Sequence, residues 1–143
     1  MEYSDDAVVS FPRGLFGFEE ERRFVVIENP AVRPILFLQS LSTPALCFLA
    51  LPVFVVDPGY RLELSPEDLE VCGLPVDEQP RIGGDLLCLT LVTVREGQPT
   101  TANLLAPLVV CMRRRQAVQA ISIATRYSHE EPFLEPAGSV ACW

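Results

Sequence analysis

Apolar residues along this chain fall into short runs, and prolines and glycines separate one run from the next. Short apolar runs bounded by turn residues favour strands over helices. The run over residues 86–94 is apolar or threonine throughout, which is typical of a strand buried on both faces. We expect nine strands, at residues 7–11, 24–28, 35–41, 45–51, 53–56, 61–64, 86–95, 107–112 and 116–124.

Many short strands joined by tight turns predict an all-β fold. A compact antiparallel β-barrel or a sandwich suits this pattern, because closing the sheet also protects the edges of its strands. A length of 143 residues matches one hydrophobic core, so we expect residues 1–143 to form a single domain.

One segment carries the start signals of a helix. Ser65 can act as the N-cap, and Pro66 suits the first helical position. Acidic side chains at the next two positions favour the positive end of the helix dipole, and Gly73 is a typical stop. These signals predict one short helix over about residues 66–72.

The most distinctive motif, residues 11–19, reads Phe-Pro-Arg-Gly-Leu-Phe-Gly-Phe-Glu. Its two glycines are flanked by aromatic residues and predict a folded loop, because glycine permits a positive φ or a close backbone approach. In one hypothesis, Phe16 and Phe18 are exposed and meet a partner. The alternative is a turn whose phenylalanines anchor it to the core, which we favour because aromatic side chains are more often buried.

A second motif, residues 100–107, lies between two apolar strands. Its Asn103 can satisfy backbone groups in a tight connection, which favours a structural corner. A binding role for Asn103 is the second hypothesis, because loops on a rigid β scaffold often carry function.

The acidic residues are unevenly distributed. The chain has 19 acids, 11 bases and a net charge of −8, and residues 63–85 contribute −6 of that charge. This segment contains one arginine and seven acids, namely Glu63, Glu67, Asp68, Glu70, Asp77, Glu78 and Asp85. Such a cluster is either a solvated face or a local field that attracts a basic protein, and both interpretations stay open. The negative charge disfavours nucleic acids and anionic membranes as direct partners.

Residues that could carry catalysis or hold a metal are sparse. The five cysteines are far apart without a C-x-x-C pair, and His129 is the only histidine. The sequence therefore predicts no disulfide framework, metal site, cofactor or catalytic residue. A rival hypothesis is a small-ligand-binding or thiol-based enzymatic barrel that uses Cys88 or Cys111 with His129. A third is RNA binding through the arginines at 113–115, for which a solvated hairpin tip is the favoured interpretation.

The start of the chain bears on its location. Residues 1–6 are polar and acidic, which is the reverse of a secretion signal. No apolar run approaches the roughly 20 residues that a membrane span needs. Together with the scattered cysteines, this leads us to expect a protein of the reducing cytoplasm.

The motifs above, in this order, resemble those of the flagellar assembly factor FliW family. Residues 11–19 look like the family's opening motif, the Leu-Gln-Ser sequence at 38–40 like its next strand, and residues 101–107 like its signature corner. The order and spacing of several motifs make the resemblance specific.

The resemblance covers about residues 2–134, and the tail at 137–143 lies outside it. Where the family typically has arginine and histidine before a proline, this chain has Glu130 and Glu131. The resemblance implies a non-enzymatic, barrel-like protein that binds flagellin in the cytoplasm. After flagellin export, such a protein binds and antagonises the translational regulator CsrA, so that CsrA no longer represses flagellin mRNA. We expect a monomer when the protein is free.

Combined with the acidic segment, the resemblance suggests that the protein docks beside the basic RNA-binding surface of CsrA and repels RNA from it. We expect the partner-binding side chains to include Glu67, Asp68, Glu70, Asp77, Glu78, Phe16, Phe18 and Asn103. Replacing the acids at 67, 68 and 70 with lysine is expected to leave the fold intact and to abolish antagonism of CsrA.

Overall fold

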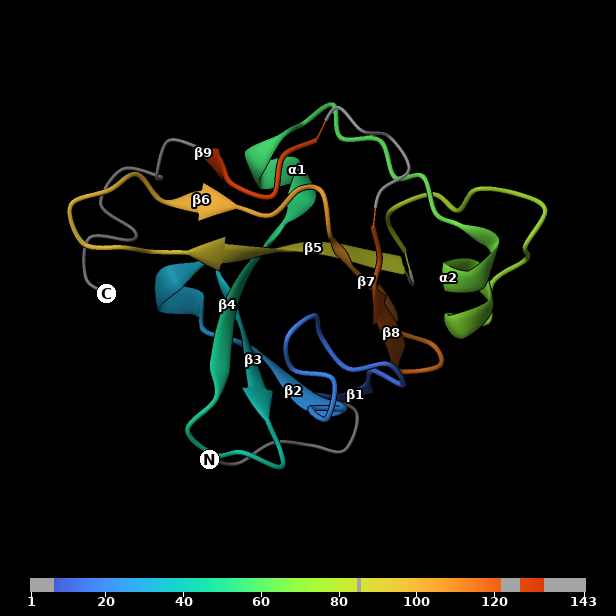
Figure 1. Ribbon diagram of the computed structural model, residues 1–143, viewed down its shortest axis with the longest axis horizontal. Coiled ribbons are helices and arrows are strands. Elements are labelled where there is room, and N and C mark those ends of the chain that lie inside the picture. The colour runs from blue at the N-terminus through green and yellow to red at the C-terminus, as the bar shows by residue number, and fades with distance from the viewer. Residues whose placement is uncertain (1–6, 85, 122–126, 133–143) are drawn as a thin grey trace.

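The computed structural model describes residues 7–84, 86–121 and 127–132. These residues form nine strands and two short α-helices (Figure 1). The strands are β1 (Val8–Ser10), β2 (Arg23–Glu28), β3 (Leu36–Ser40), β4 (Cys47–Pro52), β5 (Leu86–Thr93), β6 (Thr101–Ala102), β7 (Leu108–Cys111), β8 (Gln116–Gln119) and β9 (Glu131–Pro132). The helices are α1 (Val53–Val56) and α2 (Pro66–Val71), with a short 3-10 helix, η2 (Pro30–Val32).

Seven strands close into a barrel in the order β4-β3-β2-β1-β8-β7-β5, because β5 pairs back with β4. Strand β6 pairs with β5, and β9 pairs with β6, which extends the sheet beyond the ring. Neighbouring strands are antiparallel except β1 and β8, which are parallel and pair through Ser10 and Gln116. The predicted all-β barrel is confirmed, with one parallel junction in an otherwise antiparallel sheet.

The core lies on both faces of the wall formed by β5, β7 and β8. Every strand of the ring contributes to the buried cluster inside the barrel, which comprises Val9, Phe11, Leu15, Phe24, Leu38, Ala50, Leu89, Leu108, Val110 and Ala117. A second cluster covers the outer face and includes Leu64, Leu69, Cys88, Val109 and Val118. Because successive side chains of a strand point to opposite faces, this wall is buried on both sides, as its continuous apolar sequence predicts.

Helix α2 packs on the outer face of the barrel against β8 and begins as predicted. The hydroxyl of Ser65 accepts a hydrogen bond from the backbone N–H of Asp68 at 3.2 Å. Leu69 is buried in the outer cluster, which ties the short helix to the barrel. After the helix, Gly73 takes a positive φ of 71°, a conformation that ends helices and suits glycine.

The predicted strand at 53–56 is wrong, because these residues form helix α1. Val53 turns into the outer core, and its carbonyl accepts a hydrogen bond from the N–H of Asp57 at 2.9 Å. These contacts override the strand preference of the valines, which shows that tertiary burial outweighs local propensity here.

The predicted strand at 61–64 is also absent, although the alternation behind it is real, since Leu62 and Leu64 are both buried. The backbone of Leu64 bonds to a side chain instead of a neighbouring strand. Its N–H donates to Oε1 of Gln79 at 2.8 Å, and its carbonyl accepts from Nε2 of Gln79 at 3.0 Å. The segment is therefore pinned to the loop after α2 without joining the sheet.

The other seven predicted strands are present, six of them close to their expected bounds, whereas the one predicted at 116–124 ends at Gln119. Residues 113–115 lie in the turn between β7 and β8. Asp85, residues 1–6, residues 122–124 of the last predicted strand and the tail at 137–143 lie outside the described residues. Within the described part, no helix is both long enough and apolar enough to cross a membrane.

Candidate functional site

A groove of about 390 Å³ lies between the aromatic loop, residues 11–19, and the start of α2. We call it the loop–helix groove. It brings together Phe16 and Asp68, two residues predicted to bind a partner, from distant parts of the chain. Its lining comprises Arg13, Gly14, Phe16, Ser65, Asp68, Gln119 and Ile121.

The aromatic loop folds as a miniature hairpin. The backbone N–H of Leu15 donates to the carbonyl of Phe18 at 3.2 Å, and the N–H of Phe18 donates back to the carbonyl of Leu15 at 2.7 Å. Gly14 has a φ of 67°, and a Cβ there would lie 2.5 Å from the carbonyl oxygen of Glu19. Only glycine fits at this position, where two parts of the loop backbone come close together, and this explains why the motif has glycine there.

The aromatic loop has both buried and exposed apolar side chains, and a partner-binding role for the exposed ones stays a prediction. Phe11 and Leu15 are buried inside the barrel and anchor the loop. Phe16 and Phe18 stay outside, with 51% and 42% of their surface exposed. Phe18 packs edge-to-face on Phe48 with ring centroids 5.2 Å apart, whereas Phe16 stands at the groove. The structure thus leaves Phe16 as the aromatic side chain most accessible from the groove.

Gln119 fixes the loop to the barrel, and it is a residue that the sequence reasoning missed. Its Oε1 accepts a hydrogen bond from the backbone N–H of Phe16 at 2.8 Å. Its Nε2 donates to the carbonyl of Ala106 at 3.2 Å. A glutamine inside the otherwise apolar residues 117–120 was a usable signal, because a buried polar side chain needs partners.

Glu21 fixes the other side of the aromatic loop. Its backbone N–H donates to the carbonyl of Phe18 at 3.0 Å, and its carboxylate accepts hydrogen bonds from the hydroxyls of Ser40, Thr43 and Ser42. The bonds from Ser40 and Thr43 lower the pKa of Glu21 below its ordinary value. These contacts connect the loop to the turn after β3.

Asp68, which we predicted to bind a partner, is paired with a side chain of the protein itself. It is only 7% exposed, and its carboxylate forms an ion pair with the guanidinium of Arg13 at the floor of the groove. Its charge is therefore compensated within the protein and holds the aromatic loop against α2. This corrects the expectation that lysine at this position leaves the fold intact, because a buried cation would face Arg13.

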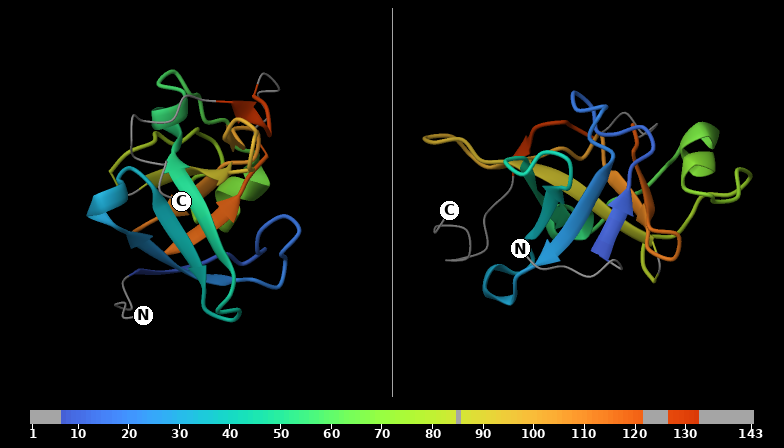
Figure 2. Two further views of the ribbon diagram at one scale, coloured as in Figure 1. Left: turned by 90° about the vertical axis from the view of Figure 1, so that its left-hand side faces the viewer. Right: turned by 90° about the horizontal axis from the view of Figure 1, so that it is seen from below.

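The remaining described acids of the segment are more exposed than Asp68. Glu67, Glu70, Asp77 and Glu78 are all exposed, and Glu63 is partly buried. The four exposed acids belong to α2 and the loop after it, which project together from one side of the barrel in Figure 1 and in the right-hand view of Figure 2. Four exposed carboxylates are thus gathered in one projecting segment.

Asn103 forms the predicted structural corner. Its backbone N–H donates to the carbonyl of Leu91 at 3.0 Å, and its side-chain oxygen accepts from the N–H of Ala106 at 3.0 Å. The groove does not include it. A binding role for Asn103 stays a prediction.

The geometry gives the thiol hypothesis little support. Cys88 is 1% exposed in the outer core, and burial raises its pKa to about 12. Its sulfur therefore stays a protonated, unreactive thiol near neutral pH. Cys111 is also buried, whereas His129 is exposed. Among the residues that the structure describes, no group of three or more histidine, cysteine or acidic side chains could hold a metal.

The arginine turn at 113–115 contributes to a separate groove of about 320 Å³ beside the parallel junction of β1 and β8. Arg23, Arg114 and Arg115 line it together with Ser10. Aromatic side chains that could stack on bases are absent from this lining, so it lacks the stacking platform of single-stranded RNA sites.

Comparisons with known proteins agree with the fold and with the motifs. The family model described as FliW protein matches residues 1–133. The flagellar assembly factor FliW of Heliobacterium modesticaldum is 33% identical over 129 residues, which cover 90% of this chain and 80% of that protein. The corresponding protein of Geobacillus kaustophilus is 34% identical over 128 residues, covering 89% and 84%. A crystal structure of the flagellar assembly factor FliW superposes with a TM-score of 0.78 and 31% identity, covering 94% of this chain and 91% of that one.

Proposed function

Because the chain belongs to the FliW family, whose curated members are flagellar assembly factors, we propose that it binds flagellin and the translational regulator CsrA in turn. In this proposal it is a non-enzymatic, single-domain protein of the cytoplasm, monomeric when free. Flagellin occupies it while flagellin accumulates, and export of flagellin releases it to bind CsrA. Translation of flagellin mRNA then resumes.

The exposed acids of the α2 segment carry the proposal for CsrA. Glu67, Glu70, Asp77 and Glu78 are exposed in one projecting segment without being neutralised by an ion pair within the described residues. Such a segment attracts a basic protein surface and repels the phosphates of RNA bound beside it. Screening limits the repulsion to about 8 Å at physiological salt, so these carboxylates must lie close to the RNA path.

The loop–helix groove carries the proposal for flagellin. Phe16 and Ile121 line it together, with more than half of their surface exposed, and exposed apolar side chains grouped in a groove favour a protein interface. Ser65, the N-cap of α2, lines the same groove. A partner seated there would crowd the acidic segment, which explains in physical terms why the two partners would exclude each other.

The CsrA half of the proposal is tested by reversing exposed charges on α2. The double variant Glu67→Lys with Glu70→Lys leaves the Asp68 ion pair in place, so it should fold normally. We expect it to release little RNA from CsrA. The matched control is Glu20→Lys with Glu96→Lys, two exposed acids outside the segment, which make the same change in net charge. Equal loss of RNA release in both variants would contradict a role for the α2 segment.

The flagellin half is tested by Phe16→Ala, with Phe54→Ala on α1 as the matched control. Phe54 is 44% exposed, close to the exposure of Phe16, but lies outside the groove. We expect Phe16→Ala to weaken flagellin binding by at least about tenfold, as for a central apolar contact, and Phe54→Ala to leave it unchanged. Calorimetric titration with flagellin measures both, and equal affinities would exclude the groove.

A further inference from the structure

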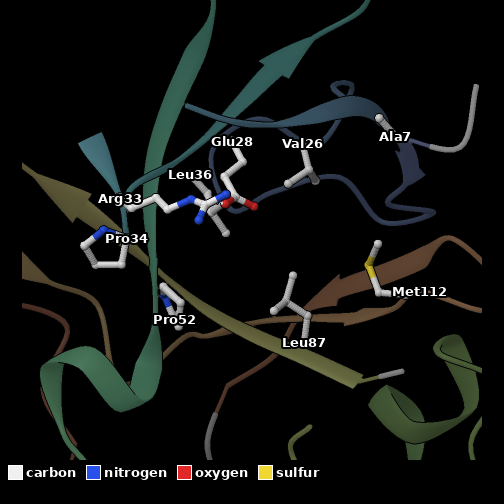
Figure 3. Close-up of a pocket in the computed structure, with 9 residues that line it drawn as sticks. All are labelled: Ala7, Val26, Glu28, Arg33, Pro34, Leu36, Pro52, Leu87 and Met112. Atoms are coloured by element: carbon white, nitrogen blue, oxygen red, sulfur yellow. Dashed lines mark ion pairs between the residues drawn. The ribbon is translucent and has the colours of Figure 1, made fainter. Parts of the chain in front are cut away.

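One end of the barrel opens into an apolar pocket of about 500 Å³, which we call the mouth pocket (Figure 3). It shares no lining residue with the loop–helix groove. Its walls come from barrel strands and the segments next to them, namely Ala7, Val26, Pro34, Leu36, Pro52, Leu87 and Met112. Glu28 and Arg33 complete the lining.

The register of the barrel explains why this pocket is apolar. Val26, Leu36 and Leu87 each lie two residues from an inward-facing core residue, so they share its side of the strand. These three side chains pack against the inner cluster, which fills the barrel one layer further in, but they are only partly buried. Met112, 37% exposed, follows β7 at the same end. The mouth pocket is therefore the last inward layer of the barrel, lined by core-type side chains and left accessible.

The rim of the mouth pocket carries one ion pair. Nε of Arg33 lies 2.5 Å from Oε1 of Glu28, and the two side chains are 63% and 51% exposed. Figure 3 shows the two side chains pointing toward one another. The rim thus presents a carboxylate that accepts hydrogen bonds and a guanidinium that donates them, with no net charge between them.

We propose that the mouth pocket binds an uncharged stretch of a polypeptide, which inserts one large aliphatic side chain between the walls and lays its backbone across the rim. A peptide group offers an N–H for the carboxylate of Glu28 and a carbonyl for the guanidinium of Arg33. Because the rim has no net charge, a charged ligand would lose water there without gaining a net counter-charge, so the rim selects against both carboxylates and amines. The volume of about 500 Å³ lies in the range of ligand pockets and leaves room for a large side chain with its flanking peptide groups.

This inference does not depend on the identity of flagellin or CsrA as partners, because it is drawn from the pocket and its rim alone. Its test therefore uses the isolated protein and small probes. The chain has 2 methionines, Met1 and Met112, so labelling the methionine methyl groups with carbon-13 gives an NMR signal inside the mouth pocket. The variant Met112→Leu assigns that signal by removing it.

The probe is N-acetyl-leucine N-methylamide, which carries a leucine side chain between two peptide groups. It should shift the Met112 signal in a saturable manner. The alanine analogue should bind at least about tenfold more weakly, because it buries less apolar surface. Two charged probes with a similar aliphatic group, 4-methylpentanoate and 3-methylbutylammonium, should also bind more weakly than the leucine probe.

Variants of the rim separate recognition from a merely structural role of the ion pair. Glu28→Gln should strengthen binding of 4-methylpentanoate, and Arg33→Gln should strengthen binding of 3-methylbutylammonium, because each leaves an unpaired rim charge opposite in sign to the probe. Both side chains are exposed, so both variants should stay folded. Ala7→Phe, which fills the mouth from its edge, should abolish the shift by the leucine probe.

Two results would overturn the inference. The first is a Met112 signal that none of the probes shifts in a saturable manner. The second is binding of 4-methylpentanoate to the unmodified protein at least as tight as that of the leucine probe, which would assign the mouth pocket to a carboxylate ligand. Neither result bears on the exposed acids of α2 or on Phe16, so the proposed function is tested separately.

Discussion

The ion pair between Asp68 and Arg13 allows a direct test of how the aromatic loop is held against α2. The carboxylate of Asp68 is buried in the first turn of the helix, whereas the side chain of Arg13 is 49% exposed. Asp68→Asn keeps the size of the side chain and removes its charge. We expect this change to destabilise the protein by weakening the contact between the loop and the helix.

The size of the effect follows from the unequal exposure of the two partners. Breaking a fully buried pair costs about 3–5 kcal/mol, and breaking an exposed pair about 0.2–1 kcal/mol. Since water can still reach Arg13, we expect Asp68→Asn to reduce the free energy of unfolding by about 1–2 kcal/mol. For a chain of this length, that corresponds to a fall in Tm of about 3–8 °C.

Urea unfolding followed by circular dichroism measures this loss, and the midpoint should fall by about 0.5–1 M. A double-mutant cycle with Arg13→Gln should give a coupling energy of about 1 kcal/mol. Glu67→Gln, at the exposed neighbouring position, is the control and should stay within about 0.5 kcal/mol of the unmodified protein. If Asp68→Asn behaved like Glu67→Gln, or if the two substitutions in the cycle were additive, the pair would not hold the loop.

Three further predictions concern the loop and the thiols. Gly14→Ala should destabilise the protein by about 2 kcal/mol or more, because it combines a positive φ with a backbone clash. A Cβ at Gly17 meets no atom within 4 Å, so Gly17→Ala should cost only about 1 kcal/mol, and thermal unfolding compares the two variants. The hydroxyls around Glu21 lower its pKa in the folded state. The carboxylate therefore stabilises the protein at a pH above its pKa in the unfolded chain, and this stabilisation is lost as the pH falls through its pKa in the folded protein. Glu21→Gln should flatten the acidic side of the profile of unfolding free energy against pH, measured by urea unfolding. Burial raises the pKa of Cys88 to about 12, so the stabilisation from its buried thiol is lost as the pH rises from about 8.5 towards that value. At pH near 8, iodoacetamide should label the exposed Cys47 far faster than Cys88, and peptide mapping by mass spectrometry measures both rates.

Most strands of the barrel and helix α2 are predictable from the sequence because their signals are local. The strand-forming run at 86–94 and the cap at Ser65 each act within a few residues. Helix α1 is not predictable in this way, because its conformation depends on the burial of Val53 in the outer core, which only the folded structure provides. The segment at 61–64 shows the same limit, since its alternation is strand-like while its backbone partner, the side chain of Gln79, lies in a different loop.

For the candidate site, the sequence identifies the acidic segment and the aromatic loop but not how they meet. The exposure of Phe16 is settled only when Phe11 and Leu15 take the core positions. The burial of Asp68 depends on Arg13, 55 residues away, so nothing next to Asp68 in the sequence distinguishes it from its exposed neighbours. Distant pairings of this kind require the fold.

The central claim, that flagellin and CsrA bind this protein in turn because their sites adjoin at α2, is tested most directly by mixing all three proteins. Size-exclusion chromatography with light scattering, at a fixed concentration of this protein and CsrA and rising flagellin, measures the composition of each complex. We expect flagellin to displace CsrA, so that each complex that elutes contains this protein with either CsrA or flagellin, but not both. A stable complex containing all three proteins would contradict the claim.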